Sequence, residues 1–152
     1  MTIRTATIED VPRIVELGAA LHTESPRWSR IPFNPARAAE TMSRLILNTD
    51  GVVFLSEVDG VVVGGIAGLL QPHWACDANV AHEMSFVIDP EYRGGMAACR
   101  LICALVAWGK IKGAAWLHAG TSTGLDAEMV AKLYARLGFE RCSIGLEYHY
   151  GN

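Results

Sequence analysis

FVIDPEYRGGMAA, residues 86–98, is the stretch that says most about how this chain folds. Its apolar start predicts the end of a β-strand, which Pro90 terminates, and Gly94 and Gly95 then allow a tight turn. A helical pattern begins at about Gly95 and continues to Trp108. The first N–H groups of a helix lack internal partners and carry the positive end of its dipole. The stretch therefore predicts either a phosphate or pyrophosphate site or an ordinary turn.

Length and composition limit the class of protein. The chain has 152 residues, of which 51% are hydrophobic and 19% charged, so we expect one folded domain over residues 1–152. No apolar run reaches the roughly 18 residues of a membrane span, and the N-terminus lacks the apolar core of a signal peptide. A cytoplasmic protein with no membrane partner is expected. The net charge of −3 weighs against nucleic acid as a partner without excluding it.

The pattern of apolar residues predicts an α/β fold with a mixed sheet and helices on both faces. Helices are expected from about residue 11, from Asn34–Pro35, from about Gly95 and over 126–137. Strands are expected over 2–6, 52–57, 61–70, 80–88, 116–119, 139–142 and 144–150, with a hairpin at Asp59–Gly60.

Glu83 is the candidate for acid–base chemistry. It lies in the mostly apolar run AHEMSF, residues 81–86, within a strand that should be central. A carboxylate there is costly unless it is paired or opens into a cleft. A solvated strand end or an arginine partner would give it a purely structural role. His82 points to the opposite face of the strand, so the two are not expected to act together.

Three segments carry a resemblance to a known family. RGGMAA, residues 93–98, resembles the R/Q-x-x-G-x-G/A loop of the GNAT superfamily of N-acetyltransferases, although Met96 stands where the family usually has glycine. LYARLGF, residues 133–139, is similar to the LYxxLGF segment near the GNAT C-terminus. Residues 3–14 are similar to the family's first strand and helix. The resemblance covers nearly the whole chain and implies the GNAT fold, with a mostly antiparallel sheet of six to seven strands.

The resemblance also implies site residues. Acetyl-CoA would bind through main-chain pairing to the strand and through the turn that follows, which together comprise Phe86, Val87, Ile88, Arg93, Gly94, Gly95, Met96, Ala97 and Ala98. Glu83 would be the general base, and Tyr134 would be the acid that faces the coenzyme sulfur. A main-chain N–H near Phe86 would stabilise the oxyanion. The asparagine that usually precedes this tyrosine by seven residues is replaced by Ala127.

The acceptor is the least determined part of the site. In the family it is bound by two loops, which here contain the candidate substrate-binding residues Trp28, His73 and Trp74. The tryptophans suit an apolar or flat acceptor, whereas Glu24 and Asp77 suit a cationic one. No zinc-like spacing is present, and the four cysteines are expected to be buried free thiols, so no metal is expected.

The leading hypothesis is an N-acetyltransferase that moves an acetyl group from acetyl-CoA to a primary amine of a small molecule or a protein, by direct attack in a ternary complex. A modified nucleobase is a further acceptor, and a homodimer is left open. A second class is a non-catalytic acyl-CoA-binding domain, which the departures at Met96 and Ala127 favour. A third, a nucleotide-binding module, is disfavoured because no P-loop or dinucleotide fingerprint is present.

Overall fold

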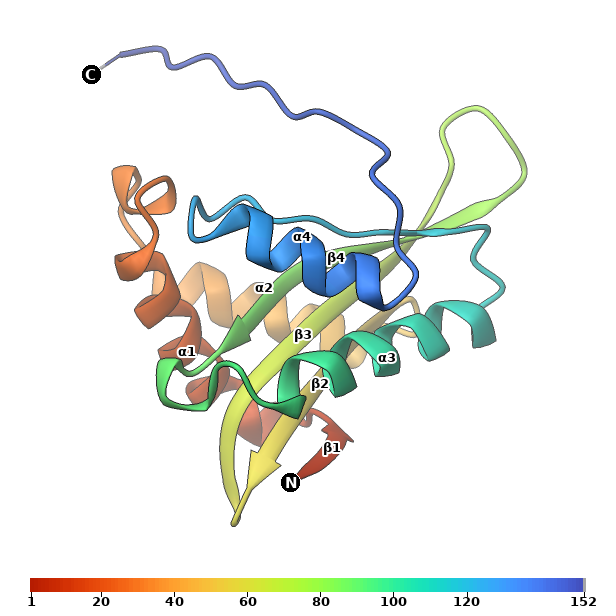
Figure 1. Ribbon diagram of the computed structural model, residues 1–152. Coiled ribbons are helices and arrows are strands. Elements are labelled where there is room, and N and C mark those ends of the chain that lie inside the picture. The colour runs from red at the N-terminus through yellow and green to blue at the C-terminus, as the bar shows by residue number, and fades with distance from the viewer. Residues whose placement is uncertain (152) are drawn as a thin grey trace.

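The computed structural model describes residues 1–151, and Figure 1 shows their arrangement. Within these residues the chain forms five strands, four α-helices and three short 3₁₀ helices. In order, they are β1 (Thr2–Thr5), η1 (Ile8–Asp10), α1 (Val11–Glu24), η2 (Trp28–Arg30), α2 (Pro35–Leu47), β2 (Gly51–Val58), β3 (Val61–Pro72), β4 (Asn79–Ile88), η3 (Pro90–Tyr92), α3 (Met96–Ile111), β5 (Leu117–His118) and α4 (Ala127–Arg136).

The strands form one sheet in the order β1-β2-β3-β4-β5. The first four are antiparallel to their neighbours, and β5 runs parallel to β4, with Ala81 opposite Leu117 and His82 opposite His118. The predicted mixed sheet is confirmed, but the prediction of six to seven strands is wrong for residues 1–151. Residues 139–142 and 144–150 form no ladder, because their extended chain runs away from the sheet and has no strand beside it.

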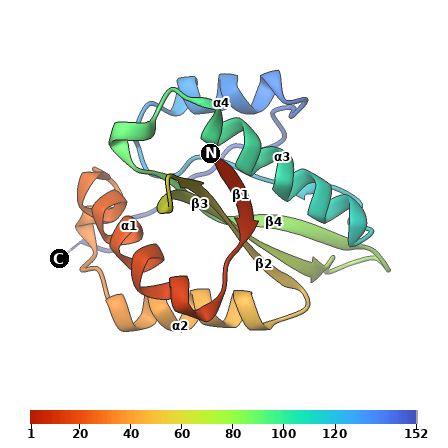
Figure 2. The same ribbon diagram turned by 90° about the horizontal axis from the view of Figure 1, so that it is seen from below.

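Helices cover both faces of the sheet, as predicted (Figure 2). α1 and α2 pack on one face, in a core that includes Leu17, Leu55 and Val87. α3 and α4 pack on the other, in a core that includes Ile66, Ile88 and Leu105. β4 contributes alternate residues to the two cores, because successive side chains of a strand point to opposite faces.

Local chemistry explains two of the element boundaries. Asp59 and Gly60 have φ values of 50° and 81°, the left-handed pair that a tight hairpin turn requires between β2 and β3. The Asn34 side chain accepts a 3.0 Å hydrogen bond from the N–H of Arg37 and so caps the start of α2. Both features follow the sequence-based expectation.

A β-bulge in β4 changes which face Glu83 occupies. Ala67 of β3 lies opposite Ser85, yet the next residue, Gly68, lies opposite Glu83, so Met84 is an extra residue. In a regular strand Glu83 would share a face with Ser85 and Val87, on the side of α1 and α2. The bulge moves Glu83 to the side of α3 and α4.

The sheet leaves no room for a side chain at Gly64 of β3. A Cβ there would lie 2.8 Å from the carbonyl oxygen of Val87 in β4, an atom that cannot move away without disturbing the strand. We predict that Gly64→Ala lowers the free energy of unfolding by about 1–3 kcal/mol, measured by urea denaturation. Gly120→Ala is the matched control, because a Cβ at Gly120 meets nothing within 4 Å. Equal stability of the two variants would contradict this account.

Candidate active site

Glu83, which is partly buried, and Tyr134, which is buried, are in contact between the sheet and α4. The Tyr134 hydroxyl donates a hydrogen bond to Oε2 of Glu83, and the tyrosine side chain is only 6% exposed. Its ring packs edge-on against Phe86 of β4 and Phe139, with centroids 6.4 Å and 5.0 Å away. The structure therefore brings together the two residues that the sequence singled out for proton transfer.

Burial gives this pair unusual acidities. It raises the pKa of Glu83 from 4.5 to about 7, and the hydrogen bond from Tyr134 opposes this rise only in part. The pKa of Tyr134 is raised well above its ordinary value, first by burial and then by the negative charge of Glu83. A carboxyl group that titrates near neutral pH is well matched to general-base catalysis.

His82 takes no part in this pair. Its ring lies 5.9 Å from that of His118 on the neighbouring strand β5. Burial and the nearby His118 both lower the pKa of His82, which favours the neutral ring.

The second half of β4 has one open edge. β5 pairs only with Ala81 and His82, so within residues 1–151 the segment Phe86–Ile88 pairs with β3 on one side and with no strand on the other. An exposed strand edge offers N–H and C=O groups to any extended chain placed beside it. The three residues predicted to contact a coenzyme through their main chain lie at this edge.

The glycine turn after β4 opens directly onto α3. Gly94 has φ of +82°, a conformation that favours glycine, whereas Gly95 has φ of −90°, which any residue adopts. The N–H groups of Met96, Ala97 and Ala98 have no acceptor within the helix, because they belong to its first turn. The N-cap residue, Gly95, supplies no side-chain acceptor for them either. The predicted anion site therefore has the required backbone geometry, and only Gly94 depends on glycine's conformational freedom.

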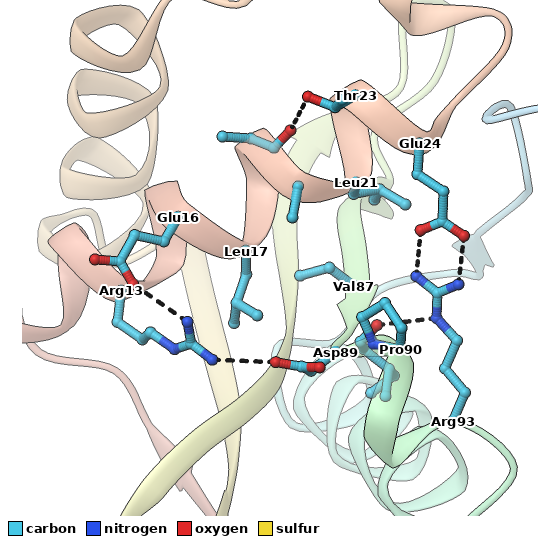
Figure 3. Close-up of a pocket in the computed structure, with 13 residues that line it drawn as sticks. Arg13, Glu16, Leu17, Leu21, Thr23, Glu24, Val87, Asp89, Pro90 and Arg93 are labelled. Carbon is cyan, nitrogen blue, oxygen red and sulfur yellow. Dashed lines mark hydrogen bonds and ion pairs between the residues drawn. The ribbon is translucent and has the colours of Figure 1, made fainter.

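A cleft of about 580 Å³ lies between α1 and the end of β4 (Figure 3). Leu17, Leu21 and Val87 form an apolar part of its wall. Five charged side chains also line it: Arg13, Glu16, Glu24, Asp89 and Arg93. Val87, Ile88 and Arg93 are the predicted coenzyme-binding residues that line this cleft, whereas the Glu83–Tyr134 pair does not line it.

Arg93 joins the two walls of the cleft. Its Nη1 and Nη2 lie 2.6 Å from the two carboxylate oxygens of Glu24 at the end of α1, and its Nε donates to the carbonyl of Ile88 at 3.1 Å. The guanidinium lowers the pKa of Glu24. Arg13 similarly reaches Asp89 at 3.3 Å. Sequence reasoning missed both pairs, because their members lie 69 and 76 residues apart and no local pattern connects them.

The predicted acceptor residues lie in two separate places. Trp28 is partly buried against the core under α1, with its ring 6.4 Å from that of His22. His73 and Trp74 lie in the connection between β3 and β4, where His73 packs against Trp116 and Trp74 is 92% exposed. Figures 1 and 2 show this connection and the segment after α1 at opposite ends of the molecule. The structure thus does not bring Trp28 together with His73 and Trp74.

The cysteines are free, as expected, but the expectation that they are buried is wrong. Cys76, Cys103 and Cys142 are exposed, and Cys99 is partly buried. Cys103 lies on the outer side of α3, whose buried stripe consists of Ala97, Leu101, Ile102, Leu105 and Gly109. Among residues 1–151, no three His, Cys, Asp or Glu side chains are grouped so that they could hold a metal ion.

No helix in this part of the chain combines the length and the apolar character that crossing a membrane requires.

The fold is an α/β domain with an open mixed sheet, a glycine turn at the start of a helix and a carboxylate–tyrosine pair beside the sheet. The family model of the acetyltransferase (GNAT) family matches residues 19–139, and the chain belongs to this family. This match confirms, at the level of family and fold, the resemblance noted in the sequence. The family uses acetyl-CoA.

Solved structures agree with this fold. A transcriptional regulator from Bacillus halodurans C-125 matches with a TM-score of 0.80 at 18% identity, covering 98% of this chain and 99% of that one. The complex of AAC(6')-Iy with a CoA bisubstrate analogue has a TM-score of 0.77 at 21% identity, covering 99% and 98%. The aminoglycoside 6'-N-acetyltransferase AAC(6')-IG from Acinetobacter haemolyticus has a TM-score of 0.76 at 15% identity, covering 100% and 99%. None of the curated protein sequences matches this chain.

The raised pKa of Glu83 predicts a pH-dependent stability. Because the folded state favours protonated Glu83, the stability it contributes is complete below about pH 4.5 and is lost as the pH rises through about 7. Relative to Glu83→Gln, which cannot titrate, the wild type should lose at most about 3 kcal/mol of unfolding free energy across this range. Urea unfolding of both proteins at several pH values measures the difference, and a pH-independent difference would contradict the raised pKa.

Proposed function

We propose that this protein transfers an acetyl group from acetyl-CoA to a primary amine by direct attack in a ternary complex. The observation that supports this most directly is the partly buried hydrogen bond from Tyr134 to Glu83. It places a proton donor against a carboxyl group whose pKa of about 7 suits a general base.

The residues of this chain fit the coenzyme of the family. The open edge of β4 at Phe86–Ile88 can pair with the amide groups of an extended pantetheine arm. The turn at Gly94 and Gly95 and the uncapped start of α3 suit a pyrophosphate, which needs N–H donors and a positive dipole end. Arg93 adds a guanidinium beside this turn, where it is already held by Glu24. Bound acetyl-CoA would supply a reactive thioester.

Glu83 would prepare the amine. An alkylammonium group has a pKa of about 10.4 and no free electron pair, so it must lose a proton before it can attack. Ionised Glu83 accepts that proton, directly or through a water molecule. Its position on the side of α3 and α4, which the bulge at Met84 creates, keeps it on the same face as Phe86. A main-chain N–H near Phe86 is our candidate donor to the acetyl oxygen.

Tyr134 would complete the proton balance. As the new N–C bond forms and the C–S bond breaks, the departing sulfur needs a proton. The tyrosine hydroxyl can supply it and then recover a proton from Glu83, to which it is hydrogen-bonded. Starting from the ammonium form, the nitrogen loses two protons. The first, which Glu83 accepts before attack, is released to water. The second, lost as the N–C bond forms, passes through Glu83 and replaces the proton that Tyr134 gives to the sulfur.

The acceptor belongs to the class of primary amines. AAC(6')-IG, a structural neighbour, is named as an aminoglycoside antibiotic 6'-N-acetyltransferase, which is consistent with an amine on a small polar molecule. A panel of polyamines, aminoglycosides and peptide amines therefore tests the proposal.

Acetyl-CoA binding tests the proposed coenzyme site. We predict that Gly94→Val weakens binding at least tenfold, because a branched side chain cannot adopt φ of +82° without moving the turn. Gly113→Val is the matched control: its φ is +71° and nothing surrounds its Cβ, but it lies at the far end of α3. Calorimetric titration measures both affinities. Equal affinities in two folded variants would place the pyrophosphate elsewhere.

Turnover tests the acid–base pair. Glu83→Gln should lower kcat at pH 7 by about 10²–10⁴-fold, and Tyr134→Phe by at least tenfold, with coenzyme affinity within about twofold of wild type. Because the two groups act together, the double variant should lose less than the product of the single losses. The wild-type rate should also fall as the pH drops below about 7, where Glu83 becomes protonated. A wild-type protein that binds acetyl-CoA but acetylates no amine of the panel would indicate a non-catalytic binding domain.

A further inference from the structure

The side chain of Arg93 lies across the open edge of β4. The N–H of Asp89 donates to the carbonyl of Val63, next to β4 in the sheet, at 2.8 Å. The C=O of Ile88 belongs to the same trans peptide unit, so it points the opposite way, to the edge that no strand of residues 1–151 covers. Nε of Arg93 donates to this carbonyl at 3.1 Å. The arginine therefore occupies a main-chain acceptor at the edge where we place an extended ligand.

Glu24 holds the arginine in this position. Nη1 and Nη2 of Arg93 lie 2.6 Å from the two carboxylate oxygens, a bidentate arrangement that fixes the plane of the guanidinium. Figure 3 shows the side chain extended from the turn after β4 to the end of α1. Both side chains are 36% exposed. An ion pair with this exposure to solvent contributes little to the stability of the fold, so a ligand can displace it.

The end of α1 is fixed independently of this ion pair. Ser25, the residue after Glu24, is completely buried. Its hydroxyl donates to the carbonyl of Thr123 and accepts a 2.9 Å hydrogen bond from the N–H of Trp28. These bonds connect the end of α1 to the chain that precedes α4. Glu24 thus presents its carboxylate to Arg93 from an anchored main chain.

We propose that Glu24 gates the open edge of β4: its ion pair keeps Arg93 across this edge, and acetyl-CoA binds only after Arg93 has left the Ile88 carbonyl. This inference rests on the proposed coenzyme site. An amide of the pantetheine arm and the guanidinium would compete for one carbonyl, and the released arginine keeps its charge and can turn toward the phosphates. A site of this kind binds with an apparent affinity reduced by the fraction of molecules in which the edge is open.

Calorimetric titration with acetyl-CoA provides the first test. Glu24→Gln should tighten binding about threefold to tenfold, because a neutral amide holds the guanidinium less firmly and the edge is open in more molecules. Glu16→Gln is the matched control. It removes the same charge from the same cleft, but its partner Arg13 donates to the main chain of β3 at Val62. Its affinity should stay within about twofold of wild type. Unchanged or weaker binding by Glu24→Gln would overturn the proposal.

The Arg93→Ala background separates the gate from simple repulsion between Glu24 and the phosphates. Without the arginine, Glu24 has no guanidinium to hold. Adding Glu24→Gln to Arg93→Ala should therefore change the affinity for acetyl-CoA by less than about twofold, and the four proteins form a double-mutant cycle. If the tightening persists in this background, repulsion explains it and the proposal fails.

Nuclear magnetic resonance of the ¹⁵N-labelled wild type observes the gate directly. The Nε–H of Arg93 should exchange slowly with solvent in the free protein and rapidly when acetyl-CoA is saturating. Bound acetyl-CoA with this N–H still protected would overturn the gate and leave the proposed function intact. A gate that opens in a protein that acetylates no amine would overturn the proposed function alone. If neither the wild type nor Glu24→Gln binds acetyl-CoA, both proposals fail.

Discussion

One extra residue in β4 determines the geometry of the candidate active site. Met84 forms a bulge, and through it Glu83 faces α4 instead of α1. On that face it meets Tyr134, whose hydroxyl donates a hydrogen bond to the partly buried carboxylate. Without the bulge, Glu83 would lie on the face of Ser85 and Val87, and Tyr134 would lose its partner. A buried carboxylate without a hydrogen-bond donor is costly, so the bulge and the α4 tyrosine depend on each other.

This dependence connects stability with the chemistry that we propose. The burial that raises the pKa of Glu83 to about 7 also makes its ionised form a cost to the fold. Tyr134 reduces this cost by donating to the carboxylate, and its own pKa rises for the same reason. The arrangement keeps the base available near neutral pH and keeps the tyrosine protonated. These are the protonation states that an acid–base pair requires before an amine arrives.

The sequence predicted what is locally encoded. The hairpin at Asp59–Gly60, the cap at Asn34 and the helix after Gly95 follow from residue types that act within a few positions. It also singled out Glu83 and Tyr134 as candidates, the latter only through the family pattern, and the structure places the two in contact. The sequence could not predict the bulge, because nothing in residues 81–86 marks one extra residue. Nor could it predict the ion pair between Arg93 and Glu24, because that pair depends on how α1 packs against the sheet. The strand pattern at 143–150 is present in the sequence, but a ladder needs a partner that no local pattern specifies.

Two unpaired edges result from the shortness of β5. Because β5 pairs with only Ala81 and His82, the end of β4 stays open on one side, and the extended chain after β5 stays open on the other. Open edges are a liability in most sheets, because they invite non-specific pairing. Here the edge at Phe86–Ile88 has a specific proposed occupant, an extended coenzyme arm. A longer β5 would close the first edge, so the short strand that leaves the sheet incomplete also leaves room for the coenzyme arm that we propose there.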